Sequence, residues 1–186
     1  FVPLGARPPG QRGRPVDLLV LILQGVIVAA TPLVFAAIGE LVVEKSGILN
    51  LGVEGMMILG AIAGFSVTLE TGSYMLGIAS AALVGALAAS LFGLLTQILL
   101  SNQVATGLAL TIFGLGLAAL WGQGYSGEST QALGKVHIFL FSDIPIIGPL
   151  FFSYDPLIYL SVALVIGVSW FLNKTRLGLI LRSIGE

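Results

Sequence analysis

A run of 57 residues without one charged side chain, from residue 71 to residue 127, is the strongest constraint on how this chain folds. A helix rises about 1.5 Å per residue, so about 20 residues cross the roughly 30 Å of hydrocarbon in a bilayer. One helix cannot contain the whole run. The sequence therefore predicts two membrane-spanning helices, near residues 75–100 and 104–121, separated by the polar residues Ser101, Asn102 and Gln103.

The composition of the 186 residues agrees, with 56% hydrophobic and 9% charged residues and a mean hydropathy of +1.05. Soluble domains carry about 25% charged residues, so we expect an integral membrane protein in contact with lipid. A net charge of −1 without a basic cluster gives no indication of a nucleic-acid partner. The chain has no cysteine and one histidine, His137, which excludes disulfides and paired-histidine metal motifs. Without a nucleophile–base pair or a nucleotide-binding glycine loop, we expect no catalytic site, metal or cofactor.

Three further apolar segments, residues 18–39, 56–69 and 156–173, predict membrane spans, the first with a kink at Pro32. Residues 138–152 are apolar but interrupted by Asp143, Pro145 and Pro149, and we expect a re-entrant or interfacial segment there. The predicted fold is all-α: a polytopic helical membrane protein with about five transmembrane helices. Residues 1–17 would form a flexible basic tail and residues 18–186 the transmembrane domain.

Small residues recur at every fourth position in the third and fourth predicted spans, which places them on one face of each helix. They are Gly77, Ala81, Gly85, Ala89 and Gly93, and then Gly114, Ala118 and Gly122. A moving interface and static helix packing both explain such ladders, and we favour packing because it is common in helical membrane proteins.

A polar stretch at residues 43–55, which we call the elbow, separates the first two predicted spans. Its sequence is VEKSGILNLGVEG. Its glycines and Asn50 oppose a regular helix, and such backbone is tolerated at membrane depth only where protein or water satisfies its amides. Its charged side chains are interfacial anchors in one interpretation; in the other, Glu54 and Asn50 face a cavity shared with a partner subunit. The candidate pathway residues, in or near span ends, are Glu44, Lys45, Asn50, Glu54, Asn102, Gln103, Thr106 and Thr111.

Neutral polar side chains within or bordering the spans suit an uncharged, polyhydroxylated solute, although the same residue types also join helices. They are Gln24, Gln97, Asn102, Gln103, Thr106 and Thr111. Lys174, Arg176 and Arg182 predict that the C-terminal end and the elbow lie in the cytoplasm. This topology places the N-terminal tail outside despite its three arginines, and the conflict stays open.

Four stretches together resemble permease subunits of bacterial ABC importers for simple sugars and nucleosides, of the ribose and branched-chain-amino-acid type. They are VEKSGILNLGVEGMMILGA from Val43, NQVATGLALTIFGLGL from Asn102, SDIPIIGPLFF from Ser142 and TRLGLILRSIGE from Thr175. The elbow and the SDIP stretch are the most specific. Many members carry Asn at the position of Thr111, so a different solute preference is expected if this residue lines the pathway.

The resemblance implies a second permease subunit, two ATP-binding subunits that hydrolyse ATP, and an extracytoplasmic solute-binding protein, all at the bacterial inner membrane. Arg182, Gly185 and Glu186 would begin the segment that couples to the ATPase, and the chain would be the N-terminal part of a larger permease. The expected function is alternating-access transport of a simple sugar or nucleoside. An ion-coupled secondary transporter or channel is the alternative, disfavoured because the middles of the spans are uncharged. A structural membrane scaffold would explain the small-residue ladders but not the elbow.

Overall fold

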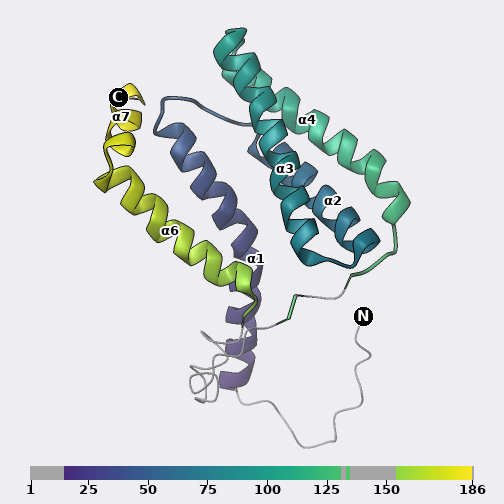
Figure 1. Ribbon diagram of the computed structural model, residues 1–186. Coiled ribbons are helices and arrows are strands. Elements are labelled where there is room, and N and C mark those ends of the chain that lie inside the picture. The colour runs from purple at the N-terminus through teal and green to yellow at the C-terminus, as the bar shows by residue number, and fades with distance from the viewer. Residues whose placement is uncertain (1–14, 131–132, 135–153, 186) are drawn as a thin grey trace, which may run out of the picture. The chain divides into compact units, whose positions relative to one another are not determined.

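The computed structural model describes residues 15–130, 133–134 and 154–185, and most of them lie in helices (Figure 1). No strand occurs within these ranges, which confirms the predicted all-α class. The elements are α1 (Pro15–Glu44), α2 (Val53–Thr71), α3 (Tyr74–Gly93), the π-helical turn η1 (Leu94–Ile98), α4 (Gln103–Gly122), the 3-10 turn η2 (Gln123–Tyr125), α6 (Pro156–Lys174) and α7 (Arg176–Gly185).

Within the described ranges, five helical segments are long and apolar enough to cross a membrane, in agreement with the predicted number of about five. One predicted boundary was wrong, because α1 continues past Gly39 to Glu44, so that Glu40 and Glu44 belong to its last turns. Carboxylates close to a span end cost little free energy, which explains why the helix tolerates them. The segments are Leu18–Glu44, Val53–Thr71, Tyr74–Ile98, Gln103–Tyr125 and Pro156–Lys174.

Large apolar side chains are exposed on these spans, for example Leu83 at 61% and Ile112 at 71%. Water would not tolerate so much contiguous apolar surface on a monomer, whereas a bilayer or a partner helix would. The chain is therefore a multi-pass membrane protein.

The chain divides into two units, residues 1–33 with 134–162 and residues 34–133 with 163–186. In the first unit, α1 remains helical through Pro32, and the Thr31 hydroxyl donates to the Ile27 carbonyl at 2.9 Å. The start of α6 in the same unit buries Ile158 and Ser161. The predicted kink at Pro32 stays a prediction.

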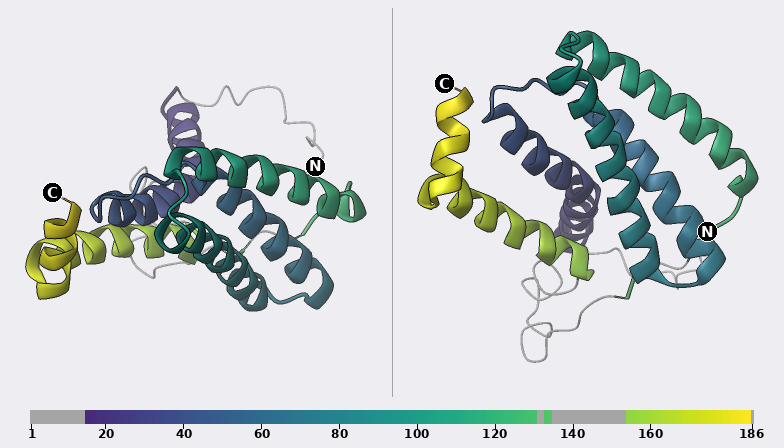
Figure 2. Two further views of the ribbon diagram at one scale, coloured as in Figure 1. Left: turned by 90° about the horizontal axis from the view of Figure 1, so that it is seen from above. Right: turned by 45° about the horizontal axis from the view of Figure 1, so that its top comes forward.

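In the second unit, α2 packs against both α3 and α4 (Figures 1 and 2). Small residues allow the α2–α3 contact: a Cβ atom added to Gly64 would lie 3.2 Å from the Gly77 carbonyl oxygen. The Ser80 hydroxyl of α3 donates to the Ala63 carbonyl of α2 at 3.1 Å. Close backbone approach and one interhelical hydrogen bond therefore hold this pair together.

Only some residues of the small-residue ladders contact a neighbouring helix. Gly77 and Ala81 of α3 contact α2, and Gly114 of α4 lies against the Gly55 backbone, so these residues bring helices close together, while the choice between static packing and a moving interface stays a prediction. Gly85 and Gly93 have no neighbour within 4 Å of the Cβ position, so this part of the ladder lies open.

At the end of the bundle away from the elbow, η2 joins α4 to α2. The Tyr125 hydroxyl donates to the Glu70 carboxylate, and the Phe65 and Tyr125 rings pack edge to face with centroids 6.3 Å apart. The predicted re-entrant segment at residues 138–152, His137 and the basic tail before residue 15 lie outside the described residues.

Candidate functional site

The elbow begins with a closed turn that ends α1. Gly47 has a φ of +82°, a left-handed conformation that glycine adopts without a Cβ clash. Its amide donates to the Glu44 carbonyl at 2.9 Å, and the Ile48 amide donates to the Val43 carbonyl at 3.3 Å. This pair of bonds is a Schellman motif, which satisfies carbonyls that the helix end would otherwise leave unpaired. The predicted break in the helix is confirmed, and Gly47 causes it.

Side chains from α1 and α4 satisfy the amides of the second half of the elbow. The Leu49 amide donates to Gln103 Oε1 at 2.8 Å, and the Asn50 amide donates to Glu40 Oε1 at 3.1 Å. Asn50 is buried, and its own Oδ1 accepts the Gly52 amide at 2.9 Å. The expectation that protein groups satisfy this backbone is therefore confirmed, because an unpaired amide at membrane depth would cost several kcal/mol.

Helix α4 presses directly on the elbow through backbone contacts. The Thr111 hydroxyl donates to the Leu51 carbonyl at 3.0 Å. A Cβ on Gly107 would lie 2.9 Å from the Leu51 amide nitrogen, and a Cβ on Gly55 would lie 2.7 Å from the Thr111 Cα. Real Cβ atoms do not approach so closely, so the interface requires glycine on both sides.

The end of α7 reaches the elbow from the other end of the chain. Thr175 starts α7 by accepting the Gly178 amide at 3.0 Å, and its hydroxyl donates to the Phe171 carbonyl at 2.7 Å. A Cβ on Gly185 would lie 2.5 Å from the Lys45 carbonyl oxygen and 2.7 Å from the Gly47 nitrogen. The elbow therefore contacts α1, α4 and α7 in one place.

Two more predicted residues, Asn102 and Thr106, lie at the start of α4 and make hydrogen bonds there. Asn102 Oδ1 accepts the Ala105 amide at 3.0 Å and so caps the helix N-terminus. The Thr106 amide donates to the Asn102 carbonyl at 2.9 Å, inside the first turn. Among the neutral candidates, Asn50, Asn102, Gln103 and Thr111 thus all make hydrogen bonds that shape the elbow or the start of α4.

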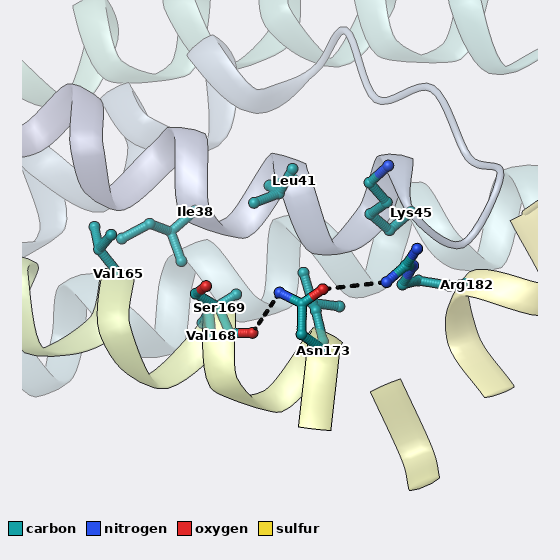
Figure 3. Close-up of a pocket in the computed structure, with 9 residues that line it drawn as sticks. Ile38, Leu41, Lys45, Val165, Val168, Ser169, Asn173 and Arg182 are labelled. Carbon is teal, nitrogen blue, oxygen red and sulfur yellow. Dashed lines mark hydrogen bonds between the residues drawn. The ribbon is translucent and has the colours of Figure 1, made fainter. Parts of the chain in front are cut away.

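The charged candidates lie apart from this network. Glu44 and Glu54 are exposed, and Glu54 sits in the first turn of α2, where the helix dipole favours a carboxylate. Lys45 and Arg182 line a cavity of about 440 Å³ beside α1 and α6 (Figure 3). The Arg182 guanidinium donates to Asn173 Oδ1 at 3.2 Å. Glu186, the third predicted coupling residue, lies outside the described residues.

Sequence reasoning did not identify Glu40 as a residue that holds the elbow. A carboxylate one turn before a helix end is tolerable without a partner, so its bond to Asn50, ten residues later, left no local signal. Gly107 was also missed, because it lies outside the every-fourth-residue pattern of Gly114 and Ala118.

The site gives mechanical support to the elbow through hydrogen bonds and close backbone contacts. The described residues contain no group of three or more histidine, cysteine or acidic side chains that could hold a metal ion. Its polar groups hold backbone, and its glycines bring helices together. Such an arrangement fixes a non-helical joint between two membrane spans.

Three curated proteins are similar to this chain in sequence. A putative glucose ABC transporter permease of Haloferax volcanii is 38% identical over 169 residues, which cover 89% of this chain and 51% of the relative. A nucleoside ABC transporter permease of Lactococcus lactis is 33% identical over 182 residues, 92% of this chain and 57% of the relative. A guanosine ABC transporter permease of Bacillus subtilis is 30% identical over 186 residues, again 57% of the relative.

The chain spans about half the length of these curated relatives. No solved structure matches it. A family model for the permease component of branched-chain amino acid transport systems matches residues 22–186, a range that includes the elbow, α4 and α7. The protein therefore belongs to this family of ABC transporter permeases.

Proposed function

We propose that the chain forms part of the translocation pathway of an ATP-driven importer for a small, uncharged polar solute, a simple sugar or a nucleoside. Membership of the permease family supports the role in transport. The names of three relatives, which refer to glucose, nucleosides and guanosine, support the class of solute.

The proposed assembly contains a second permease subunit, two ATP-binding subunits that hydrolyse the nucleotide, and an extracytoplasmic solute-binding protein. The membrane is the bacterial inner membrane. In this assembly Arg182, Gly185 and Glu186 belong to the segment that docks on an ATP-binding subunit.

The contact of Gly185 with the elbow is the observation that carries this proposal. Backbone atoms that already touch cannot approach further, so a push on α7 moves Lys45 and Gly47 with it. The elbow is bonded in turn to Gln103 and Thr111 of α4. A displacement that begins at the ATP-binding subunit would thus reach the elbow and α4. In this way it would open the pathway alternately to the two sides of the membrane.

The exposure of their side chains divides the pathway candidates into two groups. Glu44, Lys45 and Glu54 are exposed and Thr106 is half-buried, so these side chains are the ones free to meet a solute or a second subunit. Asn50, Asn102, Gln103 and Thr111 would act by shaping the elbow beside the pathway, and Thr111 would do so through Leu51.

The test is ATP hydrolysis by the full-length permease with its ATP-binding subunits and solute-binding protein in proteoliposomes. Glucose, guanosine and leucine are supplied in parallel, and uptake of each labelled solute is measured with and without ATP. We expect one sugar or nucleoside to stimulate hydrolysis and to accumulate only with ATP. Uptake that needs an ion gradient but no ATP would establish the ion-coupled alternative instead.

A further inference from the structure

The corner between α3 and α4, residues 98–102, exposes three consecutive large apolar side chains. Ile98, Leu99 and Leu100 are 72%, 64% and 83% exposed. The corner lies inside the run of residues 71–127 that carries no charged side chain, so its polar groups are neutral. Apolar surface of this size avoids water, and the corner is therefore suited to contact with lipid.

The backbone of the corner is also suited to lipid. The Leu99 amide donates to the Leu94 carbonyl and the Ser101 amide to the Leu95 carbonyl, each at 3.0 Å. Leu100 has a φ of +54°, a left-handed conformation that is costly for a leucine and not for a glycine. Burial of the leucine side chain in a membrane offsets this cost.

The start of α2 lies well below the level of this corner. At their other ends, α2 and α3 are joined by Gly72 and Ser73, and Gly64 lies against Gly77, so the two helices run side by side in opposite directions. The α3 span is six residues longer than the α2 span (25 against 19). This excess carries the corner about 9 Å past the start of α2. Figures 1 and 2 show the corner extending beyond that point.

The register of the elbow along α4 gives a similar depth. The Leu49 amide donates to Gln103, the first residue of α4, whereas Gly55 lies against Thr111. Thr111 follows Gln103 by eight positions, a rise of about 12 Å along a helix. The second half of the elbow therefore descends along α4, away from the corner, before α2 begins.

Glu54, in the first turn of α2, is exposed at this depth. The headgroup region on each side of a bilayer is about 5–8 Å thick. With the corner in the headgroups, a point about 10 Å deeper lies at the level of the acyl chains. A carboxylate is costly in contact with acyl chains, and the elbow is held by bonds to Glu40, Gln103 and Thr111 rather than to Glu54. Water is therefore needed at Glu54.

We propose that Ile98, Leu99 and Leu100 lie in the headgroup region of the leaflet on the elbow's side, and that a water-filled inlet descends beside α4 to Glu54. The partner of the corner is lipid, and the occupant of the inlet is water. One further step rests on the transport function proposed above: the inlet is the mouth of the pathway on this side, where Glu54 accepts hydrogen bonds from hydroxyl groups of the solute.

The experiment measures the surroundings of spin labels on the full-length permease in liposomes. The 186 residues contain no cysteine, so single cysteines are introduced after any cysteine elsewhere in the permease has been replaced. Labels at Leu100→Cys and Glu54→Cys are compared by their collisions with oxygen, which concentrates in lipid, and with a nickel chelate, which stays in water. Leu83→Cys, exposed in the middle of α3, is the lipid control, and Lys174→Cys, exposed at the end of α6, is the water control.

We expect the label at Leu100 to collide severalfold more often with oxygen than with the chelate, as at Leu83. The label at Glu54 should show the reverse preference, as at Lys174, although it lies deeper than the corner. A charged thiol reagent attached to Glu54→Cys should stop ATP-driven solute uptake by the reconstituted complex, whereas the same reagent on Lys174→Cys should leave uptake unchanged.

Four results would overturn the proposal. A label at Leu100 that prefers the chelate means that the corner protrudes into water, and shielding from both reagents means that protein covers it. A label at Glu54 that prefers oxygen means that no inlet reaches it. Full uptake after modification of Glu54→Cys means that the inlet is not the mouth of the pathway. Absence of sugar or nucleoside uptake by the unmodified complex would instead contradict the proposed function, and the collision measurements would still decide the inlet.

Discussion

Replacing Gly55 by alanine should separate α4 from the elbow, since Gly55 lies where the two backbones are closest. The new Cβ would lie 2.7 Å from the Leu110 carbonyl oxygen and 2.7 Å from the Thr111 Cα. Both neighbours are backbone atoms, so no side chain can rotate away. Helix α4 must retreat by about 0.7 Å to restore ordinary contact, which stretches the 3.0 Å bond from Thr111 to Leu51 beyond hydrogen-bonding distance.

The free energy of unfolding should fall by about 1–3 kcal/mol. Overpacking of a close contact costs about 1–3 kcal/mol, and the lost hydrogen bond about 1 kcal/mol. The higher helix propensity of alanine offsets up to about 1 kcal/mol of this cost. For a membrane protein of this size, the apparent Tm should drop by roughly 2–6 °C.

The assay is thermal unfolding of the purified full-length permease in detergent, followed by tryptophan fluorescence. Gly116→Ala is the matched control, because it changes the same residue type in α4 at a site with no neighbour within 4 Å. Its Tm should stay the same or rise. Gly114→Ala strains the same interface, so the double variant with Gly55→Ala should cost less than the sum of the two. Equal Tm values for Gly55→Ala and Gly116→Ala would show that α4 and the elbow do not need glycine at their contact.

Three further predictions concern bonds at the elbow. Gly185→Ala should reduce solute-stimulated ATP hydrolysis by the reconstituted complex severalfold, because its Cβ would collide with the Lys45 carbonyl. The control Gly167→Ala lies in open space and should leave the stimulation unchanged. Unchanged stimulation in Gly185→Ala as well would contradict the prediction. Thr111→Val should lower the free energy of unfolding by about 1 kcal/mol, whereas Thr111→Ser retains the hydrogen bond to the Leu51 carbonyl. Equal denaturation curves for the two variants would show that this bond does not stabilise the protein. Glu40→Leu should lower the free energy of unfolding by about 1–3 kcal/mol, because the Asn50 amide loses its acceptor. Glu40→Gln keeps an acceptor and should retain most of that stability. Equal losses in the two variants would show that the charge of Glu40 matters instead.

The breaks between spans could be predicted because their signals are local. Ser101 to Gln103 is the polar point in a long apolar run, and the glycines and Asn50 of the elbow oppose a helix wherever they stand. The end of α1 could not be placed well, because Glu40 and Glu44 look like the start of a loop by hydropathy alone. In the structure the helix continues through Glu40 to Glu44, and the Gly47 and Ile48 amides close its end by donating to the Glu44 and Val43 carbonyls.

The hydrogen-bond partners at the elbow could not be predicted from the sequence. Asn50 and Thr111 were named as candidate pathway residues, a role that stays a prediction, and in the structure both make hydrogen bonds that hold the elbow. The bond between Thr111 and Leu51 joins residues 60 positions apart, and the bond between Gln103 and Leu49 joins residues 54 apart. No local pattern encodes such pairs, because they depend on which face of α4 lies against α2.

The membrane spans, about five in number, and the break at the elbow follow from local sequence signals. Hydropathy, glycine and asparagine act over a few residues, and the same physics applies in any surroundings. The meeting of α4 and α7 at that elbow follows instead from how the helices pack. Backbone contacts such as Gly55 with Thr111 and Gly185 with Lys45 exist only after the helices have packed.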